Sequence, residues 1–409
     1  MTQLLFEIGT EEIPAGYIKP ALSFMEQASQ AKFKALGLSF GRVSSVGTPR
    51  RLTLAVDDLQ ERQEDRRQEH IGPAKKAAFD ADGNPTKAAL GFARSRGAAV
   101  EDLQIVATKK GEYLMAVEEV KGRATGDLLP DLLDDLLRSI PFPKSMHWAN
   151  SSMAFARPLQ WLLAQYDGKV VDFTVEGVRS GETTLGHRFM SPEPVRVQGF
   201  SHYQDQLAAK SVIVDQDKRR RLVIQEVKKA VLERVGEGGQ PVLDQGLIDT
   251  VTNLVEIPWG VCGSFDEKFL ALPDEALITS MREHQKYFPV VDTEGALLPY
   301  FVAVNNTDIK DQKLAASGHE RVLRARLEDG LFFFNEDKKK PLADRMDDLF
   351  GIIFQHQLGT MAEKSDRLSV ISAFLADRLA PDLKEDAKRA AQLAKVDLLT
   401  EMVGEFPSL

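Results

Sequence analysis

LITSMREHQKYFPVVDTEGALLPYFVAVNN, residues 277–306, contains the clearest local signals for secondary structure in this chain. Its first residues place apolar side chains at the spacing of one helix face, namely Leu277, Ile278 and Met281. Pro289 excludes further helix, and the turn residues that follow it separate two apolar runs, which predicts a β-hairpin. We therefore expect the polar residues 282–287 at a helix end beside a sheet.

Regular patterns on both sides of this stretch predict an α+β fold, with a large N-terminal body of mixed sheets and helices. We expect strands at 4–8 and 52–56, a hairpin around 110–112, and helices over 17–36, 87–95, 128–140, 217–235, 244–255 and 319–335. Residues 57–70 are almost all polar, which predicts a loop or an exposed helix. The glycine-rich segment 236–241 is the clearest linker signal. The predicted domains are 1–235, 236–340 and 341–409.

Composition and charge restrict the class of protein. The chain has 409 residues, of which 43% are hydrophobic and 28% charged, as is ordinary for a globular protein with several domains. Its one cysteine, Cys262, excludes an internal disulfide framework and a cysteine-rich zinc site. No apolar run is long enough to span a bilayer, so we expect a cytoplasmic protein without a membrane partner. The net charge of −9 repels nucleic acid at long range, so RNA would have to bind to local basic patches.

Five segments are spread along the chain, and several of them are long and unusual. They are 6–14 (FEIGTEEIP), 48–52 (TPRRL), 186–190 (GHRFM), 277–306 and 321–335. Together they resemble the β subunit of bacterial heterotetrameric glycyl-tRNA synthetase. The resemblance implies a tRNA-binding, non-catalytic subunit of an α2β2 glycine–tRNA ligase, in which the separate α subunit binds ATP and Mg²⁺ and activates glycine. The implied partners are that α subunit and glycine tRNA, and no cofactor is expected on this chain.

The sequence contains no constellation that indicates catalysis. It has no glycine-rich phosphate loop, no nucleophile elbow and no histidines at metal spacing, so we expect neither catalytic nor metal-binding residues. Basic side chains in the unusual segments are candidates for phosphate contacts, because a guanidinium matches phosphate geometry. The predicted RNA face consists of Arg50, Arg51, Arg282, Lys286, Arg321, Arg324 and Arg326. For Arg50 and Arg51, a solvated strand edge is the alternative.

Three further features carry histidine or basic residues. For His187 we expect a structural or an RNA-contacting role, since no second ligand lies at metal spacing. The basic run 218–221 opens a helix and indicates a solvated face, with an RNA-facing surface as the alternative. The segment 72–97 collects Lys75, Lys76, Lys87, Arg94 and Arg96 around a turn.

The last segment, 349–399, has three helical runs, including 354–359, and predicts an all-α domain. In the glycyl β-subunit family this region resembles an HD-type phosphohydrolase domain, which holds its metal with an adjacent His-Asp pair. Here the matching residues are Val396 and Asp397. Valine cannot bind a metal, so we expect a helical scaffold or an RNA-binding surface.

Two alternative functions remain open: a scaffold that only assembles the α subunit, and a degenerate HD-type metal-dependent phosphohydrolase. The resemblance also implies an N-terminal fragment that ends within the HD-like domain, without the region that reads the anticodon. The tRNA contacts of such a fragment would be to the backbone, the acceptor arm or the elbow.

Overall fold

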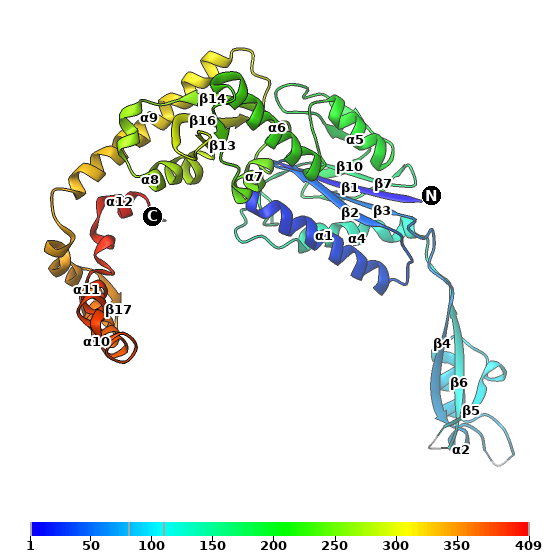
Figure 1. The fold of residues 1–409 in the computed structure, drawn as a ribbon. Coiled ribbons are helices and arrows are strands. Elements are labelled where there is room, and N and C mark those ends of the chain that lie inside the picture. Colours follow the sequence, from blue (N-terminus) through cyan, green and yellow to red (C-terminus); the bar gives the residue numbers. More distant parts are fainter. Residues whose placement is uncertain (1, 81, 109–110, 408–409) are drawn as a thin grey trace. The chain divides into compact units, whose positions relative to one another are not determined.

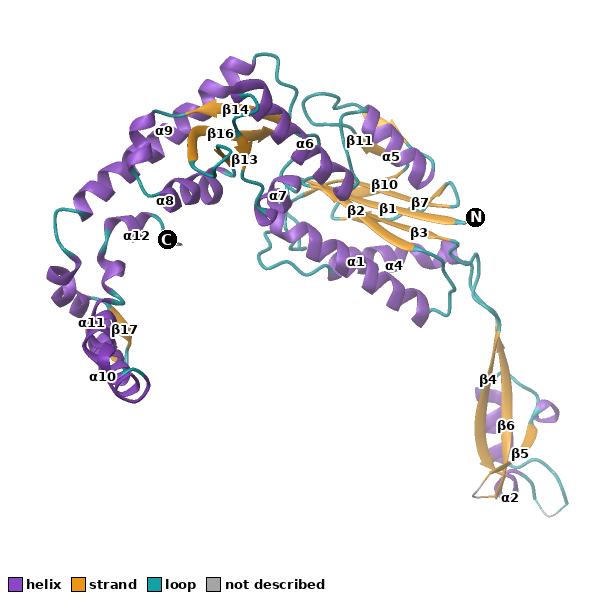
Figure 2. Cartoon of the chain, viewed as in Figure 1, coloured by secondary structure: helices purple, strands orange, loops and turns teal. Residues whose placement is uncertain are grey.

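The structure is a computed structural model, and it describes residues 2–80, 82–108 and 111–407. Strands are concentrated in the N-terminal part and helices in the C-terminal part (Figure 2), which confirms the predicted α+β class. The chain divides into two compact units, Met1–Lys210 and Ser211–Leu409. The predicted linker 236–241 lies within the second unit, where it joins α6 (Gln216–Val235) to β13 (Gln240–Pro241).

A seven-stranded sheet is the centre of the first unit. Its strands are β1 (Gln3–Thr10), β2 (Val43–Thr48), β3 (Arg51–Asp57), β7 (Leu159–Tyr166), β8 (Lys169–Val170), β9 (Thr174–Val175) and β10 (Val178–Gly181). Their order is β2-β3-β1-β7-β10-β9, with β8 paired to β7 outside this path. The central strand β1 is antiparallel to both neighbours, and it runs past the predicted end because Gly9 still pairs with Arg51 and Trp161.

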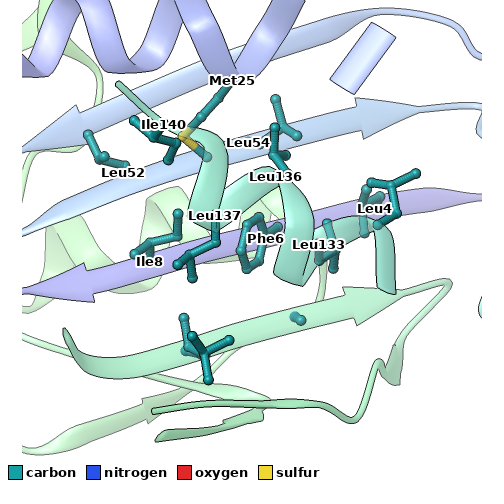
Figure 3. Close-up of a cluster of buried hydrophobic side chains, with 14 of the residues drawn as sticks. Leu4, Phe6, Ile8, Met25, Leu52, Leu54, Leu133, Leu136, Leu137 and Ile140 are labelled. Atoms are coloured by element: carbon teal, nitrogen blue, oxygen red, sulfur yellow. The ribbon is translucent and has the colours of Figure 1, made fainter. Parts of the chain in front are cut away.

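Two helices, α1 (Ala15–Ala35) and α4 (Thr125–Ser139), cover one face of this sheet (Figure 1). Alternate residues of β1, namely Leu4, Phe6 and Ile8, belong to this core and are fully buried. Figure 3 shows them together with Met25 of α1 and the leucines of α4. The other face is covered by α5 (Gly199–Ala209), which follows the two short strands β11 (Thr183–Leu185) and β12 (Pro194–Arg196). The residues between Leu4, Phe6 and Ile8 therefore point toward the α5 layer.

An insertion between β3 and α4 folds as a small sheet with two helices. Its strands, in the order β4-β6-β5, are β4 (Arg66–Ala74), β5 (Gln104–Thr108) and β6 (Gly111–Val120). Its two α-helices are α2 (Lys75–Ala78) and α3 (Lys87–Ser95), and the 3₁₀ turn η1 (Val100–Asp102) follows them. The β5–β6 hairpin is confirmed. The prediction of a loop or an exposed helix over 57–70 agrees with the irregular segment 58–65, but it is wrong for 66–70, where β4 begins. Most of β4 is exposed, so it lacks the apolar alternation that indicates a strand.

The stretch 277–306 forms the predicted helix and hairpin in the second unit. The helix α8 (Asp274–Thr279) continues as the π-helix η3 (Ser280–Gln285), and β15 (Phe288–Val291) pairs antiparallel with β16 (Leu297–Asn305). With β14 (Trp259–Ser264) and β13 they form a sheet in the order β13-β15-β16-β14. Other elements are α7 (Gln245–Thr252), η2 (Glu267–Ala271) and α9 (Gln312–Asp337). Along β16, Val302 packs with α6 and α7, while Phe301 and Ala303 pack with α8 and α9.

After α9 the chain is mostly helical. The helices are η4 (Leu342–Gly351), α10 (Met361–Leu379), η5 (Pro381–Leu383), α11 (Lys384–Leu393), η6 (Val396–Leu399) and α12 (Glu401–Glu405). The helical run predicted at 354–359 is wrong, since β17 (Ile353–Gln355) and β18 (Gly359–Thr360) form a short hairpin there. Gly359 has a φ of 83°, which an α-helix does not accept. None of the described helices is both long and apolar enough to cross a membrane.

Candidate nucleic-acid interface

Two of the unusual segments, 6–14 and 48–52, are joined by backbone hydrogen bonds at one end of β1. The amide of Thr10 donates to the carbonyl of Arg50 (2.8 Å), and the amide of Ile13 donates to the carbonyl of Pro49 (2.7 Å). These bonds fix the two segments side by side, because buried backbone groups must be paired.

Arg51 and Glu7 form a buried ion pair across β3 and β1. Both side chains have no exposed surface, and 3.9 Å separates Arg51 Nη1 from Glu7 Oε1. The same Glu7 oxygen accepts hydrogen bonds from Trp161 Nε1 (2.7 Å) and Thr184 Oγ1 (2.8 Å). Arg51 Nη1 also donates to the carbonyl of Leu185 (2.8 Å). The pair thus joins four segments of the first unit, and removing one partner would leave the other charge buried.

The polar groups around Glu7 titrate outside their usual ranges. Burial raises the pKa of the Glu7 carboxyl, although the Arg51 charge and the hydrogen bonds oppose this effect. Burial also raises the pKa of Tyr203 well above its usual value, and the neighbouring Glu7 charge adds to the shift. The Tyr203 hydroxyl shares a hydrogen bond of 2.8 Å with Thr53 Oγ1. This cluster lies in the interior between the sheet and α5, where its hydrogen bonds connect the two layers.

Burial removes Arg50 and Arg51 from the predicted RNA face. Their exposed fractions are 7% and 0%. Their guanidinium carbons lie 5.4 Å and 5.3 Å from the centroid of the Trp161 ring, within cation–π distance. Gly9 makes room for this ring, since a Cβ there would lie 2.0 Å from an indole atom. Guanidinium groups enclosed in this way offer a phosphate almost no surface, so the burial argues against both the solvated edge and the RNA contact for these residues.

The segment 186–190 forms a tight loop near the first motif. His187 is fully buried, and its Nδ1 atom accepts hydrogen bonds from two backbone amides of the loop, both at 3.3 Å. Arg188 donates to the carboxylate of Glu11 (2.5 Å). Phe189 stays 71% exposed at the tip. Of the two roles expected for His187, the geometry supports the structural one, because the ring shapes the loop from inside.

The basic run 218–221 is also partly internal. Arg219 is fully buried and donates to the backbone carbonyl of Thr252 (2.7 Å) and to that of Ile213. Arg220 forms an ion pair with Asp249 (2.9 Å). Two arginines therefore connect the first half of α6 to α7. A fully solvated run of charges would not make these contacts.

The polar segment 282–287 stands at a helix end beside a sheet, as predicted. The π-helix η3 is followed by Lys286 in a left-handed conformation (φ 59°). The Tyr287 hydroxyl then lies 2.9 Å from His319 Nδ1 of α9, and His319 Nε2 lies 2.9 Å from Asn305 Oδ1 of β16. Burial lowers the pKa of His319 and raises that of Tyr287 to about 12. A neutral His319 with its proton on Nε2 can accept the hydrogen bond from the Tyr287 hydroxyl and donate one to Asn305 Oδ1.

Arg282 and Lys286 line a hollow of about 270 Å³ beside α7. Both cations have acidic or carbonyl neighbours. Arg282 Nε lies 3.0 Å from Glu283 Oε1, and its Nη1 lies 4.0 Å from Asp244 Oδ2. Lys286 Nζ donates to the Glu283 carbonyl (2.8 Å). The hollow can accept a small anionic group only at the cost of loosening these contacts.

The three predicted arginines of α9 have different surroundings. Arg326 donates to Glu405 of α12 (2.8 Å), so this guanidinium connects α9 to α12. Arg321 and Arg324 lie on the exposed side of the helix, whereas Leu323 between them is fully buried. Within the part of the chain that the structure describes, the side chains of Arg321 and Arg324 make no hydrogen bond and no ion pair. Of the predicted face, these two are the available guanidinium groups.

In the helical region after α9, an apolar residue occupies the position where an HD-type domain would need a metal ligand. Val396 is fully buried in a small cluster with Leu349 and Ala362. Across residues 2–80, 82–108 and 111–407, no group of three or more histidine, cysteine, aspartate or glutamate residues could hold a metal ion.

Sequence reasoning missed the partners of Glu7 and of His319. A signal existed for Glu7, because it is the one charged residue within the apolar run 4–8, and a charge at such a position requires a buried partner. No local signal existed for the Tyr287–His319–Asn305 chain. Its members come from a loop, a helix and a strand, and their contact depends on how α9 packs on the sheet.

Comparisons with known proteins agree with the motifs. A family model described as the glycyl-tRNA synthetase beta subunit matches residues 4–409. The chain is 47% identical over 407 residues to the glycine–tRNA ligase beta subunit of Syntrophus aciditrophicus, and 47% identical over 408 residues to that of Citrifermentans bemidjiense. These alignments cover 100% and 99% of this chain but 59% of each relative, so the chain spans about three fifths of their length. Since the family model matches nearly every residue, the chain belongs to the glycyl-tRNA synthetase beta-subunit family.

Proposed function

We propose that this chain is a tRNA-binding, non-catalytic part of a glycine–tRNA ligase. In this proposal an α subunit binds ATP and Mg²⁺ and forms the activated glycine, while the present chain holds glycine tRNA in the assembled enzyme. The observation that carries the proposal is the pair of exposed guanidinium groups on α9, Arg321 and Arg324, which have no partner among the described residues.

The electrostatic argument starts from the net charge of −9. A chain with this charge gains nothing from long-range attraction to RNA, so affinity has to come from cations that are locally uncompensated. Arg321 and Arg324 meet this condition, because an exposed arginine without an ion pair keeps all its donors for phosphate oxygens. Their spacing of three residues puts them on neighbouring positions of one helix face.

The other predicted cations contribute less to this proposal. Arg326 would have to give up Glu405, and Arg282 and Lys286 are already close to Glu283. We therefore place the main phosphate contacts at Arg321 and Arg324 and a secondary contact at the hollow beside α7.

The test is a salt series of binding to glycine tRNA and to a non-cognate tRNA. The variant carries Arg321→Ala and Arg324→Ala. We expect weaker binding and a log–log salt dependence that is flatter by about two units, because each lost phosphate contact removes about one. The matched control carries Arg179→Ala and Arg196→Ala, which removes the same charge from exposed arginines that are paired with Asp172 and Glu182.

Equal salt dependence in the two double variants would contradict the proposed surface. If the unmodified chain co-purifies with the α subunit but binds no tRNA, the chain is an assembly scaffold instead. A preference for the glycine tRNA over the non-cognate one would place part of the tRNA discrimination within these 409 residues.

A further inference from the structure

The segment 72–97 is basic although the chain is acidic. It contains five cations and two carboxylates, a net charge of +3, within a chain whose net charge is −9. The segment lies in the insertion that carries β4, β5 and β6, and it includes α2 and α3. None of the residues in the predicted RNA face belongs to it.

The helix α3 has one face against the sheet and one face toward solvent. Ala89 and Ala93 are buried, and Phe92 packs so closely on β4 that a Cβ at Gly72 would lie 2.5 Å from its ring. Lys87 and Arg94 are exposed on the other side. They are seven residues apart, which is two turns of helix and about 10 Å along the axis. They can therefore contact two separate phosphates of one strand or of two strands.

The two cations of this face, and Arg96 at the C-cap of α3, have no polar partner among the described residues. The side chains of Lys87, Arg94 and Arg96 make no hydrogen bond and no ion pair with any residue that the structure describes. Lys75, in contrast, is paired with Glu112 (2.8 Å). A Cβ at Gly91, which follows the exposed Leu90, would meet no atom within 4 Å, so no side chain of the fold crowds this part of the helix.

The charge of Lys87 is also unfavourable at its position in the helix dipole of α3. It is the first residue of α3, and the first turn contains no acidic residue. The positive end of the helix dipole is at the N-terminus, where a cation is unfavourable and a carboxylate is favourable. The helix start is instead fixed by Thr86, whose hydroxyl accepts from the amide of Ala88 (3.3 Å) and donates to the carbonyl of Ala77 (2.7 Å). The fold therefore gives no reason for a lysine at position 87, because its side chain makes no polar contact with the described residues and its charge opposes the helix dipole.

We propose that Lys87 and Arg94, the α3 basic patch, form a second phosphate-binding surface for RNA. The proposal rests on the proposed function, because it takes tRNA as the ligand. A protein partner fits less well: protein interfaces are anchored by clustered apolar and aromatic side chains, and Leu90 is the one large apolar side chain exposed on α3. The backbone of an RNA duplex needs no such anchor, since its phosphates bind to separated cations.

The experiment uses the whole chain with Lys87→Glu and Arg94→Glu, and a control with Arg179→Glu and Arg196→Glu. Both double variants change the net charge by the same amount. We expect the first variant to bind glycine tRNA at least ten-fold more weakly than the control at low salt, with a salt dependence flatter by about two units. Thermal unfolding separates binding from folding. The glutamate at position 87 favours the helix dipole and the one at position 94, in the last turn, opposes it, so the Tm should change little.

The outcomes separate this inference from the proposed function. Equal affinity and equal salt dependence in the two charge-reversed variants would overturn the α3 basic patch. If Arg321→Ala with Arg324→Ala still weakens binding in that case, the proposed function stands without the second surface. Complete absence of tRNA binding by the unmodified chain would overturn both.

Discussion

The arginine pair Arg50–Arg51 in the first unit and the pair Arg321 and Arg324 in the second unit occur in equally unusual segments, but their surroundings are opposite. Arg51 is fully buried beside Glu7, with Trp161 within cation–π distance. Arg321 and Arg324 are exposed and make no polar contact with the described residues. The same side chain is part of the core in one unit and an available cation in the other.

The difference comes from the element that carries each pair. Arg51 begins β3, which is paired on both sides in the middle of a sheet, so alternate side chains point into a protein layer whatever their polarity. Arg321 and Arg324 flank the buried Leu323 on a helix with one apolar stripe, so they fall outside the contact. An arginine in a central strand therefore indicates a buried partner, and an arginine beside a helix stripe indicates a surface.

The largest effect is expected from Arg51→Met. This change leaves the Glu7 carboxylate buried without its counter-charge, which typically costs about 3–5 kcal/mol of the free energy of unfolding. Urea unfolding of the variant and of the unmodified chain at neutral pH measures the loss. The exposed and ion-paired Arg179 is the control, and Arg179→Met should leave the unfolding midpoint unchanged.

The pH dependence of this variant sharpens the test. The pKa of Glu7 is raised in the folded chain, so protonation favours the folded state, and this contribution is lost as the pH rises from the unfolded value of 4.5 through the folded pKa. Without Arg51 the pKa of Glu7 should rise further. The destabilisation by Arg51→Met should thus be smaller at pH 5 than at pH 8, and a loss that does not change with pH would contradict a buried charge as its cause.

The next effect concerns the space that Trp161 occupies in the first unit. In Gly9→Ala, the new methyl group would lie 2.0 Å from the indole ring, so the ring that contacts both buried arginines has to move. We expect a loss of about 1–3 kcal/mol from overpacking. Gly16→Ala is the matched control, because Gly16 lies in α1 with no atom within 4 Å of the added Cβ.

The control should be neutral or stabilising by up to about 1 kcal/mol, since alanine favours a helix more than glycine does. Chemical unfolding of both variants measures whether each change lowers or raises the free energy of unfolding. If Gly9→Ala is as harmless as Gly16→Ala, the close approach between β1 and the indole ring is not a constraint of the folded chain.

A smaller effect is expected at His319, where a half-buried polar group stabilises the second unit. Its pKa is lowered by burial, so below the unfolded value of about 6.5 the unfolded chain binds more protons than the folded one. The stabilisation is complete above that value and is lost as the pH falls toward the folded pKa. His319→Gln should cost about 1 kcal/mol at pH 7.5 through its hydrogen bonds to Tyr287 and Asn305.

Unfolding experiments between pH 7.5 and pH 5.5 test whether the free energy of unfolding falls on acidification because of His319. The unmodified chain should lose more stability on acidification than His319→Gln, which cannot titrate at this position. Parallel curves for the two proteins over that range would show that His319 does not contribute to the pH dependence.

Local patterns were sufficient for most of the elements. The apolar spacing in α4 and the proline and turn residues of 277–306 each report a short-range preference, and the structure has the expected element at each place. The failures are β4 and the β17–β18 hairpin. Both depend on a pairing partner rather than on their own pattern, because an exposed strand has no apolar alternation to read.

The candidate site could be predicted only in part, for a related reason. Sequence reasoning identified the segments that contain the basic residues, but burial is a property of the layer that covers each segment. The buried position of Arg51 follows from the strand order β3-β1-β7 and from α5, and the pairing of Arg326 follows from Glu405, which lies 79 residues further along the chain. No local pattern contains either fact.

The smallest effect on stability is expected where the comparison began, at the exposed pair of α9. Arg321→Met with Arg324→Met removes two charges that contact no described residue, and methionine keeps the helix preference of arginine. The free energy of unfolding should change by no more than about 0.5 kcal/mol, against several kcal/mol for the single change Arg51→Met, while the affinity for glycine tRNA should fall. Urea unfolding and tRNA binding measured on the same preparations test both halves. A large loss of stability at α9 would mean that these arginines are structural like Arg51, and it would remove the reason for placing RNA there.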